Sequence, residues 1–199
     1  MGLTKRSIIG SFVRADWPYL TVFSPLWQVK AESPAGYDRL DTSKGASDGC
    51  EPFKKGPIPR RIGRTKGGLN SKLHVVCDQN GRPLQMLLSE GQLNDHVGAR
   101  LMFDAMPRAK VLIADKGYDS DDFRQALKEC GVTPCIPPRR NRKVLIAYDK
   151  ALYKTRHKIE NLFAKLKDWR RVATRYDRCS HTFFSAICIA ASCAFYLNQ

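Results

Sequence analysis

The pattern of apolar and polar residues becomes regular only after the first part of the chain. From Ser71 onward, short apolar runs alternate with polar turns, and the runs Leu73–Cys77 and Leu84–Leu88 flank an Asn-Gly pair. Asn-Gly readily adopts the positive φ angles that a two-residue turn requires. The pattern therefore predicts a β-hairpin over these two runs.

Helices and strands alternate after this hairpin. The first two predicted helices start at a capping residue and end at a Pro or Gly, and the predicted strands are short apolar runs bounded by turn residues. The expected elements are a helix capped by Asp95 and ended by Pro107, a buried strand Lys110–Ala114, a helix capped by Asp119 or Ser120 and closed by Gly131, an edge strand Val132–Ile136 that contains Pro134, a helix over residues 153–167, and an apolar C-terminal helix. This order predicts an α/β fold with a mixed sheet flanked by helices.

The helix expected over residues 153–167 has an apolar face and a polar face. At about 100° of rotation per residue, the polar face carries a single carboxylate among cations. Its members are Tyr153, Arg156, Glu160 and Lys167, and the apolar face carries Ile159, Leu162, Phe163 and Leu166. Two interpretations of Glu160 are open: an exposed ion pair with Arg156, worth a few tenths of a kcal/mol, or a ligand for a metal ion held beside phosphates.

The first part of the chain shows neither helical nor strand periodicity. Proline-containing pairs interrupt every apolar run in residues 1–52, so we expect an irregular or disordered segment there. Residues 54–68 form a basic, Gly- and Pro-rich stretch for which we expect no regular structure. Its Arg64 and Lys66 suit phosphate contact, although a solvated linker would have the same composition.

The charge of the chain indicates a class of partner. The 199 residues carry a formal net charge of +15, which implies a polyanion, with nucleic acid ahead of an acidic membrane surface. A second basic stretch, residues 137–143, adds Arg139 and Arg140 as candidate DNA contacts. A hydrophobic content of 43% indicates one folded soluble domain with an appendage.

The cysteines and the longest apolar run bear on the compartment. Seven cysteines without a C-x-x-C pair argue against a disulfide framework and a thiolate zinc site, which indicates a reducing cytoplasm. The apolar run Phe183–Tyr196 is shorter than the roughly 20 residues that a bilayer requires, so it predicts a buried helix. No apolar region with a cleavage site follows the N-terminal cations, so we expect no export and no membrane partner.

Besides Glu160, Asp115 is an acid whose position in the sequence is informative. It follows a buried strand, and ligands bind at the carboxyl ends of strands in open α/β sheets; the alternative is a turn-forming Asp before Gly117. Together with Glu160, it would present oxygen ligands amid positive charge, which select Mg²⁺ or Mn²⁺. Two such ions about 4 Å apart activate a water or a 3'-hydroxyl for attack on a phosphodiester.

The spacing of Tyr153, Arg156, Glu160 and Lys167 resembles the Y-(2)-R-(3)-E-(6)-K signature of DDE transposases from bacterial insertion sequences. Residues 53–199 are similar to the C-terminal part of the insertion-sequence-five-like group. The segments that carry this resemblance are Ile62–His74, Leu112–Asp119, Pro134–Pro138 and Leu166–Cys179. It implies a partial RNase H-like domain over residues 53–199, incomplete at its N-terminus.

The resemblance also implies roles for individual residues. Asp115 would be the second catalytic acid and Glu160 the third, and both would bind Mg²⁺ or Mn²⁺. Tyr153, Arg156 and Lys167 would contact transposon-end DNA. His74 and His157 lack ligand spacing with Cys or Asp, so we expect them to be structural or to face phosphate.

The chain departs from the family pattern at the first acid. In the family, a hydrophobic strand there ends in a motif resembling Met-Ile-Asp-Ser-Thr, whereas this chain has Tyr37–Pro52 without an apolar strand. One interpretation takes Asp41, within Asp-Thr-Ser, as the first acid. The other is a frameshift, because suitable codons for Tyr37–Pro52, read one base later, encode Met-Ile-Asp-Ser-Thr and then Ala-His-Arg-Thr-Ala. Residues 1–52 would then be out of frame, and the first catalytic Asp would be absent.

The resemblance implies DNA transposition, by metal-dependent cleavage at transposon ends and strand transfer into target DNA. The expected partners are terminal inverted repeats, target DNA and further copies of the chain on DNA. The expected location is the cytoplasm, in association with the nucleoid. The alternative is a catalytically inactive remnant that only binds DNA.

Overall fold

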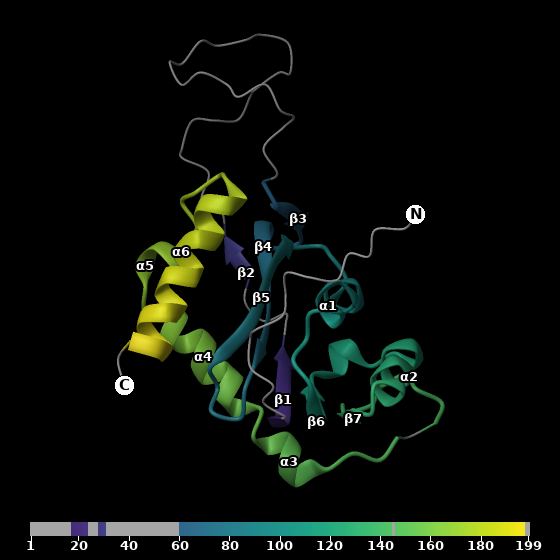
Figure 1. Ribbon diagram of the computed structural model, residues 1–199. Coiled ribbons are helices and arrows are strands. Elements are labelled where there is room, and N and C mark those ends of the chain that lie inside the picture. Colours follow the sequence, from purple (N-terminus) through teal and green to yellow (C-terminus); the bar gives the residue numbers. More distant parts are fainter. Residues whose placement is uncertain (1–16, 24–27, 31–59, 145, 198–199) are drawn as a thin grey trace, which may run out of the picture.

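A central mixed sheet is covered by helices on both faces in the computed structural model, which describes residues 17–23, 28–30, 60–144 and 146–197 (Figure 1). The strands are β1 (Trp17–Phe23), β2 (Gln28–Lys30), β3 (Gly63–Thr65), β4 (Gly68–Cys77), β5 (Pro83–Glu90), β6 (Ala109–Ala114) and β7 (Thr133–Cys135). The helices are α1 (Asp95–Phe103), the short 3₁₀ helix η1 (Lys116–Tyr118), α2 (Asp121–Glu129), α3 (Lys150–Lys154), α4 (His157–Lys167), α5 (Arg170–Ala173), α6 (Ser180–Ser192) and the π-helical turn η2 (Cys193–Leu197).

The sheet combines antiparallel and parallel strands. The strand order is β2-β4-β1-β6-β7, with β3 and β5 also paired to β4. Strands β1, β6 and β7 run parallel to one another, whereas β4 is antiparallel to β1, β2, β3 and β5. The α/β fold expected from the sequence, a mixed sheet flanked by helices, is confirmed.

The predicted hairpin forms from β4 and β5. Gly81 in its turn has a φ of 80°, which explains the requirement for glycine. The carboxylate of Asp78 accepts the backbone N–H groups of Asn80 and Arg82, both at 2.8 Å, and so closes the turn. The hairpin is longer than expected because β4 begins at Gly68.

The elements around β6 also agree with the sequence pattern. Strand β6 lies inside the sheet, between β1 and β7, and delivers Asp115 at its carboxyl end. The Oγ of Ser120 caps α2 by accepting the N–H of Phe123 at 3.2 Å, and Gly131 follows that helix with a φ of 75°. Strand β7, which contains Pro134, lies at the end of the strand order as predicted.

Two apolar clusters form the core, one on each face of the sheet. Alternate residues of β4 supply both, since Leu73 and Val75 belong to one cluster and Val76 to the other. The first cluster is completed by α4, α5 and α6, and the second by β1, β6, α1 and α2. The sheet therefore lies between two helical layers, and Asp115 sits at its edge.

Residues 1–52 differ from the expected irregular segment where they are described. Strand β1 pairs with β6 from Trp17 opposite Ala109 to Val22 opposite Ala114, and Val22 is fully buried. Pro18 is tolerated near the strand start because the antiparallel pairing with β4 covers only Thr21 to Phe23. Proline interrupted the local pattern, but pairing with strands distant in sequence stabilises β1. Asp41 lies outside the described residues.

Strand β3 corrects the expectation for the basic stretch. Residues 63–65 of this stretch pair with β4 in a tight hairpin, so this part is regular. The Nδ2 of Asn70 donates to Thr65 Oγ1 at 2.6 Å and supports the turn. Gly68 has a φ of 100°, which allows the chain to reverse. Residues 54–59 lie outside the part of the chain that the structure describes.

Two further expectations about helices require correction. Asp95 does not cap α1: it is the first helical residue, and its carboxylate pairs with Lys72 Nζ at 3.0 Å. The helix expected over residues 153–167 is divided into α3 and α4. The N–H of Arg156 bonds the carbonyl of Tyr153 at 3.0 Å, an i to i−3 contact that tightens the helix between them.

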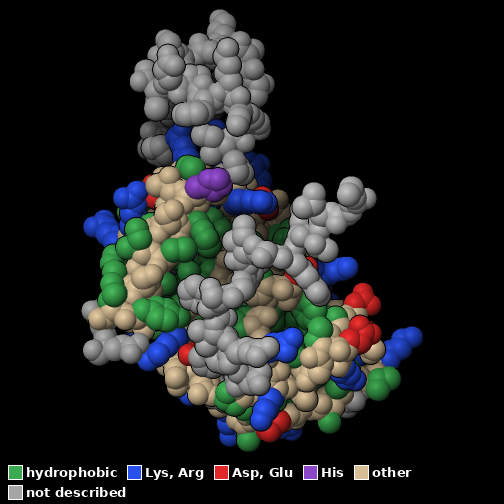
Figure 2. Space-filling view, in the orientation of Figure 1, with side chains coloured by type: hydrophobic (Ala, Val, Ile, Leu, Met, Phe, Trp, Pro, Cys, Tyr) green, Lys and Arg blue, Asp and Glu red, His purple; other side chains and the backbone are tan. Residues whose placement is uncertain are grey.

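Helix α6 is only partly buried. Phe183, Ile187 and Ala190 lie in the core, whereas Ile189 is 58% exposed. Figure 2 shows hydrophobic side chains gathered over this helix, with Lys and Arg around them. By length and composition alone, the helical stretch Ser180–Leu197 is one that could cross a membrane, a test that core helices of soluble proteins also pass. Its inner face packs as a core helix does.

Candidate active site

Asp115 is held at the end of β6 by its own turn. Its Oδ1 accepts the backbone N–H of Lys116 at 2.8 Å and caps η1. Its carbonyl accepts the N–H of Tyr118 at 2.9 Å, and the Tyr118 side chain is fully buried in the core. The buried Tyr118 side chain thus anchors the turn to the core, and Asp115 stays half-buried at the carboxyl edge of the sheet.

Tyr153 of α3 reaches the same carboxylate. Its hydroxyl donates to Asp115 Oδ1 at 3.3 Å. Burial raises the pKa of Tyr153 to about 12; the Asp115 charge adds to this effect, and Arg156 opposes it. Tyr153 is therefore a hydrogen-bond donor throughout the neutral pH range.

Arg156 and Glu160 continue this contact along the helix. Arg156 Nη2 lies 2.6 Å from Glu160 Oε1, and the Glu160 side chain is 46% exposed. The guanidinium of Arg156 also lies 5.6 Å from the centre of the Tyr153 ring, at cation–π distance. The structure thus connects Asp115 to Glu160 through Tyr153 and Arg156. Lys167 is exposed at the far end of α4.

The chemistry of the two carboxylates fits a hard divalent cation, but the described residues do not complete a site. No group of three or more Asp, Glu, His or Cys side chains placed to hold a metal occurs among them. Strand β1 neighbours β6 up to Val22 opposite Ala114, and its sequence Trp17–Phe23 contains no acid. The strand beside Asp115 therefore supplies no third carboxylate.

The predicted DNA contacts have different environments. Arg64 of β3 and Lys66 in its turn are exposed, and Arg140 is exposed in the stretch before α3. Arg139 is exposed as well, but its guanidinium bonds the carbonyls of Lys116 and Gly117. All four side chains are thus exposed, and Arg139 is in addition bonded to the turn after Asp115.

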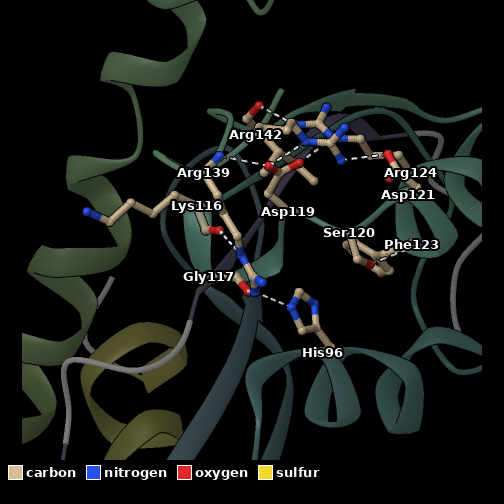
Figure 3. A network of polar contacts seen from close by, with 11 residues as sticks. His96, Lys116, Gly117, Asp119, Ser120, Asp121, Phe123, Arg124, Arg139 and Arg142 are labelled. Carbon is tan, nitrogen blue, oxygen red and sulfur yellow. Dashed lines mark hydrogen bonds and ion pairs between the residues drawn. The ribbon is translucent and has the colours of Figure 1, made fainter. Parts of the chain in front are cut away.

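Asp119 is a site residue to which sequence reasoning assigned only a possible helix cap. Its side chain is fully buried, and its carboxylate accepts Arg124 Nε at 2.7 Å and Arg142 Nε at 2.9 Å. Figure 3 shows these arginines converging on Asp119, with Arg139 directed toward Gly117 and His96. The sequence signal was an Asp close to Asp115 together with a basic stretch, but nothing local indicated that they bind each other.

A buried polar group supports the turn from the other side. His74 Nε2 lies 2.9 Å from Ser89 Oγ, and Nδ1 lies 3.4 Å from the Tyr118 hydroxyl. Burial lowers the pKa of His74 to about 4, so the ring is neutral at physiological pH. Of the two roles left open for His74, the structural one is confirmed. His157 Nδ1 lies 2.8 Å from the carbonyl of Lys154, at the junction of α3 and α4.

A mixed sheet with helices on both faces and an acid at the carboxyl end of β6 fits the class of DDE transposase domains. The family described as "Transposase DDE domain" matches residues 50–195, and this chain belongs to that family. The family resemblance drawn from the signature residues is therefore confirmed.

Two related proteins bear names from insertion sequences. The chain is 35% identical over 138 residues to the transposase named for insertion sequence element IS402 of Burkholderia cepacia, a match that covers 60% of this chain and 63% of the relative. It is 31% identical over 125 residues to the one named for IS6501 of Brucella ovis, which covers 62% of this chain and 96% of the relative. The chain thus spans less than two thirds of the IS402 protein.

Solved structures with a similar fold include two assemblies. One is the simian T-cell lymphotropic virus intasome in complex with PP2A regulatory subunit B56 gamma, with a TM-score of 0.42, 14% identity, and coverage of 73% of this chain and 51% of that one. The other is the Mos1 mariner paired end complex with Mn, with a TM-score of 0.29, 11% identity, and coverage of 88% and 53%.

Proposed function

We propose that this chain acts in DNA transposition by metal-dependent cleavage of transposon ends, followed by transfer of the freed 3'-hydroxyl into target DNA. The observation that carries this proposal is the contact between Tyr153 and Asp115, which brings α3, the first of the two helices with signature residues, to the acid at the end of β6. Membership of the transposase family supports transposition in general.

Asp115 and Glu160 are the residues that would hold Mg²⁺ or Mn²⁺. Such an ion would activate the attacking water or 3'-hydroxyl and stabilise the leaving oxygen. Tyr153 orients the Asp115 carboxylate, and Arg156 forms an ion pair with the Glu160 carboxylate. Asp41 remains the candidate for a first acid if residues 1–52 are in frame.

The DNA partners are transposon terminal inverted repeats and target DNA. The formal charge of +15 favours binding to their phosphates. The proposed contacts are Tyr153, Arg156, Lys167, Arg64, Lys66 and Arg140. Pairing of two ends would require several copies of the chain on DNA, in the cytoplasm and in association with the nucleoid.

A second candidate function is DNA binding without cleavage. Strand β1, the neighbour of Asp115, carries no acid in Trp17–Phe23, and this supports the interpretation that the first catalytic Asp is absent. The nucleotide sequence upstream of codon 53 tests the frameshift directly. A reading frame there that encodes Met-Ile-Asp-Ser-Thr supports the inactive remnant, and its absence argues for Asp41.

A cleavage assay separates the two functions. The parent chain is incubated with supercoiled or end-bearing DNA and Mg²⁺ or Mn²⁺, and Asp115→Asn and Glu160→Gln serve as isosteric controls. Cleavage by the parent and its loss in both variants supports the enzyme. Salt-sensitive binding by all three proteins without cleavage supports the remnant.

A further inference from the structure

The guanidinium of Arg139 binds the turn that directly follows Asp115. Its Nη2 donates to the carbonyl of Gly117 at 2.8 Å, and its Nε donates to the carbonyl of Lys116 at 3.3 Å. Nη2 also contacts Nε2 of His96 (Figure 3). The Nε and Nη2 donors of this exposed side chain are thus directed to acceptors of the protein.

The backbone of Arg139 is fixed to the same turn by Asp119. The Oδ2 atom of Asp119 accepts the N–H of Arg139 at 2.8 Å, and Arg142 and Arg124 also donate to this carboxylate. Burial alone would raise the pKa of Asp119, but these hydrogen bonds outweigh it and lower the pKa. Asp119 therefore stays ionised, and Arg139 is held at both its backbone and its side chain.

We propose that Arg139 is a positioning residue that acts on Asp115 through the η1 turn, in place of the DNA contact that the sequence suggested. The Lys116 N–H that holds the Asp115 carboxylate lies one peptide before the Lys116 carbonyl and two peptides before the Gly117 carbonyl, both of which Arg139 binds. Loss of the guanidinium would release these carbonyls and loosen that N–H. The role assigned to Asp115 here rests on the proposed function.

Arg139 and Arg140 are adjacent cations with different surroundings, which makes them a matched pair. Arg139 is itself exposed, but a phosphate could take up its Nε and Nη2 atoms only if these left the acceptors on Lys116, Gly117 and His96. Arg140 is exposed. The strength of a DNA contact depends mainly on the positive charge, which lysine also carries. The contacts of Arg139 with the carbonyls of Lys116 and Gly117, here called the clamp, need the forked geometry of guanidinium, which lysine cannot reproduce.

The first measurement is the salt dependence of DNA binding by the full chain, followed by fluorescence anisotropy with a duplex. Arg140→Met is expected to reduce the slope of log affinity against log salt by about 0.9, the value for one lost phosphate contact. Arg139→Met is expected to leave the slope unchanged. A reduction in Arg139→Met equal to that in Arg140→Met would overturn the proposal.

The second measurement is Mn²⁺ affinity, determined from the electron paramagnetic resonance signal of the free ion with no DNA present. Arg139→Met and Arg139→Lys are both expected to bind Mn²⁺ about tenfold more weakly than the parent, because a partner that orients a ligand is lost. Arg140→Met should match the parent. Parent-like affinity in both Arg139 variants contradicts the proposal, and circular dichroism confirms that each variant is folded.

The third measurement separates this proposal from the proposed function. If the parent binds no Mn²⁺, the metal site fails, but hydrogen exchange of the Lys116 amide still reports the clamp. Faster exchange in Arg139→Lys than in Arg140→Met supports the positioning role. Equal exchange rates of the Lys116 amide in these two variants would contradict the positioning role.

Discussion

The hydroxyl of Tyr153 donates to the carboxylate of Asp115 across 3.3 Å, although the two residues lie 38 positions apart in the chain. This bond joins α3 to the end of β6. Arg156 lies beside the Tyr153 ring and pairs with Glu160, so the chain of contacts continues from Asp115 to Glu160 on α4.

Replacing Tyr153 by Phe tests how much this hydrogen bond contributes to the stability of the fold. Tyr153→Phe removes the hydroxyl but keeps the ring, so we expect the free energy of unfolding to fall by about 1 kcal/mol. Urea denaturation measures the change. Tyr148→Phe is the matched control, because the Tyr148 ring packs edge-on against Tyr153 at 5.5 Å and this contact would persist. An equal loss in both variants would assign the effect to the rings.

The buried His74 predicts a dependence of stability on pH. Its pKa is lowered from 6.5 to about 4 by burial, so the unfolded chain takes up the proton first as the pH falls. The free energy of unfolding should therefore decrease from pH 6.5 to pH 4, by roughly 3 kcal/mol for this group. His74→Gln should lack this decrease, whereas His157→Gln on the exposed surface should retain it. Urea denaturation of the parent and both variants across this pH range measures the change in the free energy of unfolding.

The surroundings of Gly98 in α1 predict that replacing it by alanine destabilises the protein. A helical Gly→Ala exchange normally stabilises by up to about 1 kcal/mol. Here the new Cβ would lie 2.3 Å from Cε1 of His74, so we expect Gly98→Ala to lower the free energy of unfolding by about 1 to 2 kcal/mol. Thermal unfolding measures it.

The matching control for Gly98 is a double-mutant cycle. The penalty of Gly98→Ala should shrink in a His74→Ala background, because the clashing ring is gone. An unchanged penalty would mean that the ring is not the obstacle.

Of the substitutions considered, we expect the replacement of Arg175 to cause the largest loss of stability. Its side chain is 1% exposed and donates to the carbonyls of Arg60 and Asp177 and to the hydroxyl of Ser71, while its guanidinium lies 4.8 Å from the Phe183 ring centre. Arg175→Met would leave these acceptors unpaired, at a cost of about 3 kcal/mol or more.

Urea denaturation of Arg175→Met should therefore show a clear shift of the midpoint. Arg170→Met, at an exposed position of α5, should leave the midpoint unchanged. Similar midpoints for both variants would show that the buried guanidinium contributes little.

Local patterns located much of the fold and part of the candidate site. The apolar run before Asp115, the Asn-Gly turn and the cap at Ser120 each depend on residues close together in sequence, and the structure agrees with all three. Helical spacing likewise grouped Tyr153, Arg156 and Glu160, because neighbours at three or four positions share a face.

Other features depend on partners far away in the chain. Strand β1 contains Pro18 and shows no pattern of its own, yet it pairs with β6, more than 80 residues later, because that pairing buries Leu20 and Val22. Arg139 reaches Asp119 over 20 positions, and Arg175 reaches the carbonyl of Arg60 over 115. Hydrophobic periodicity and turn chemistry are properties of neighbouring residues, so they can be inferred from order alone. A buried charge is stable only where distant segments bring their donors and acceptors to it, and those partners become visible only in the folded chain.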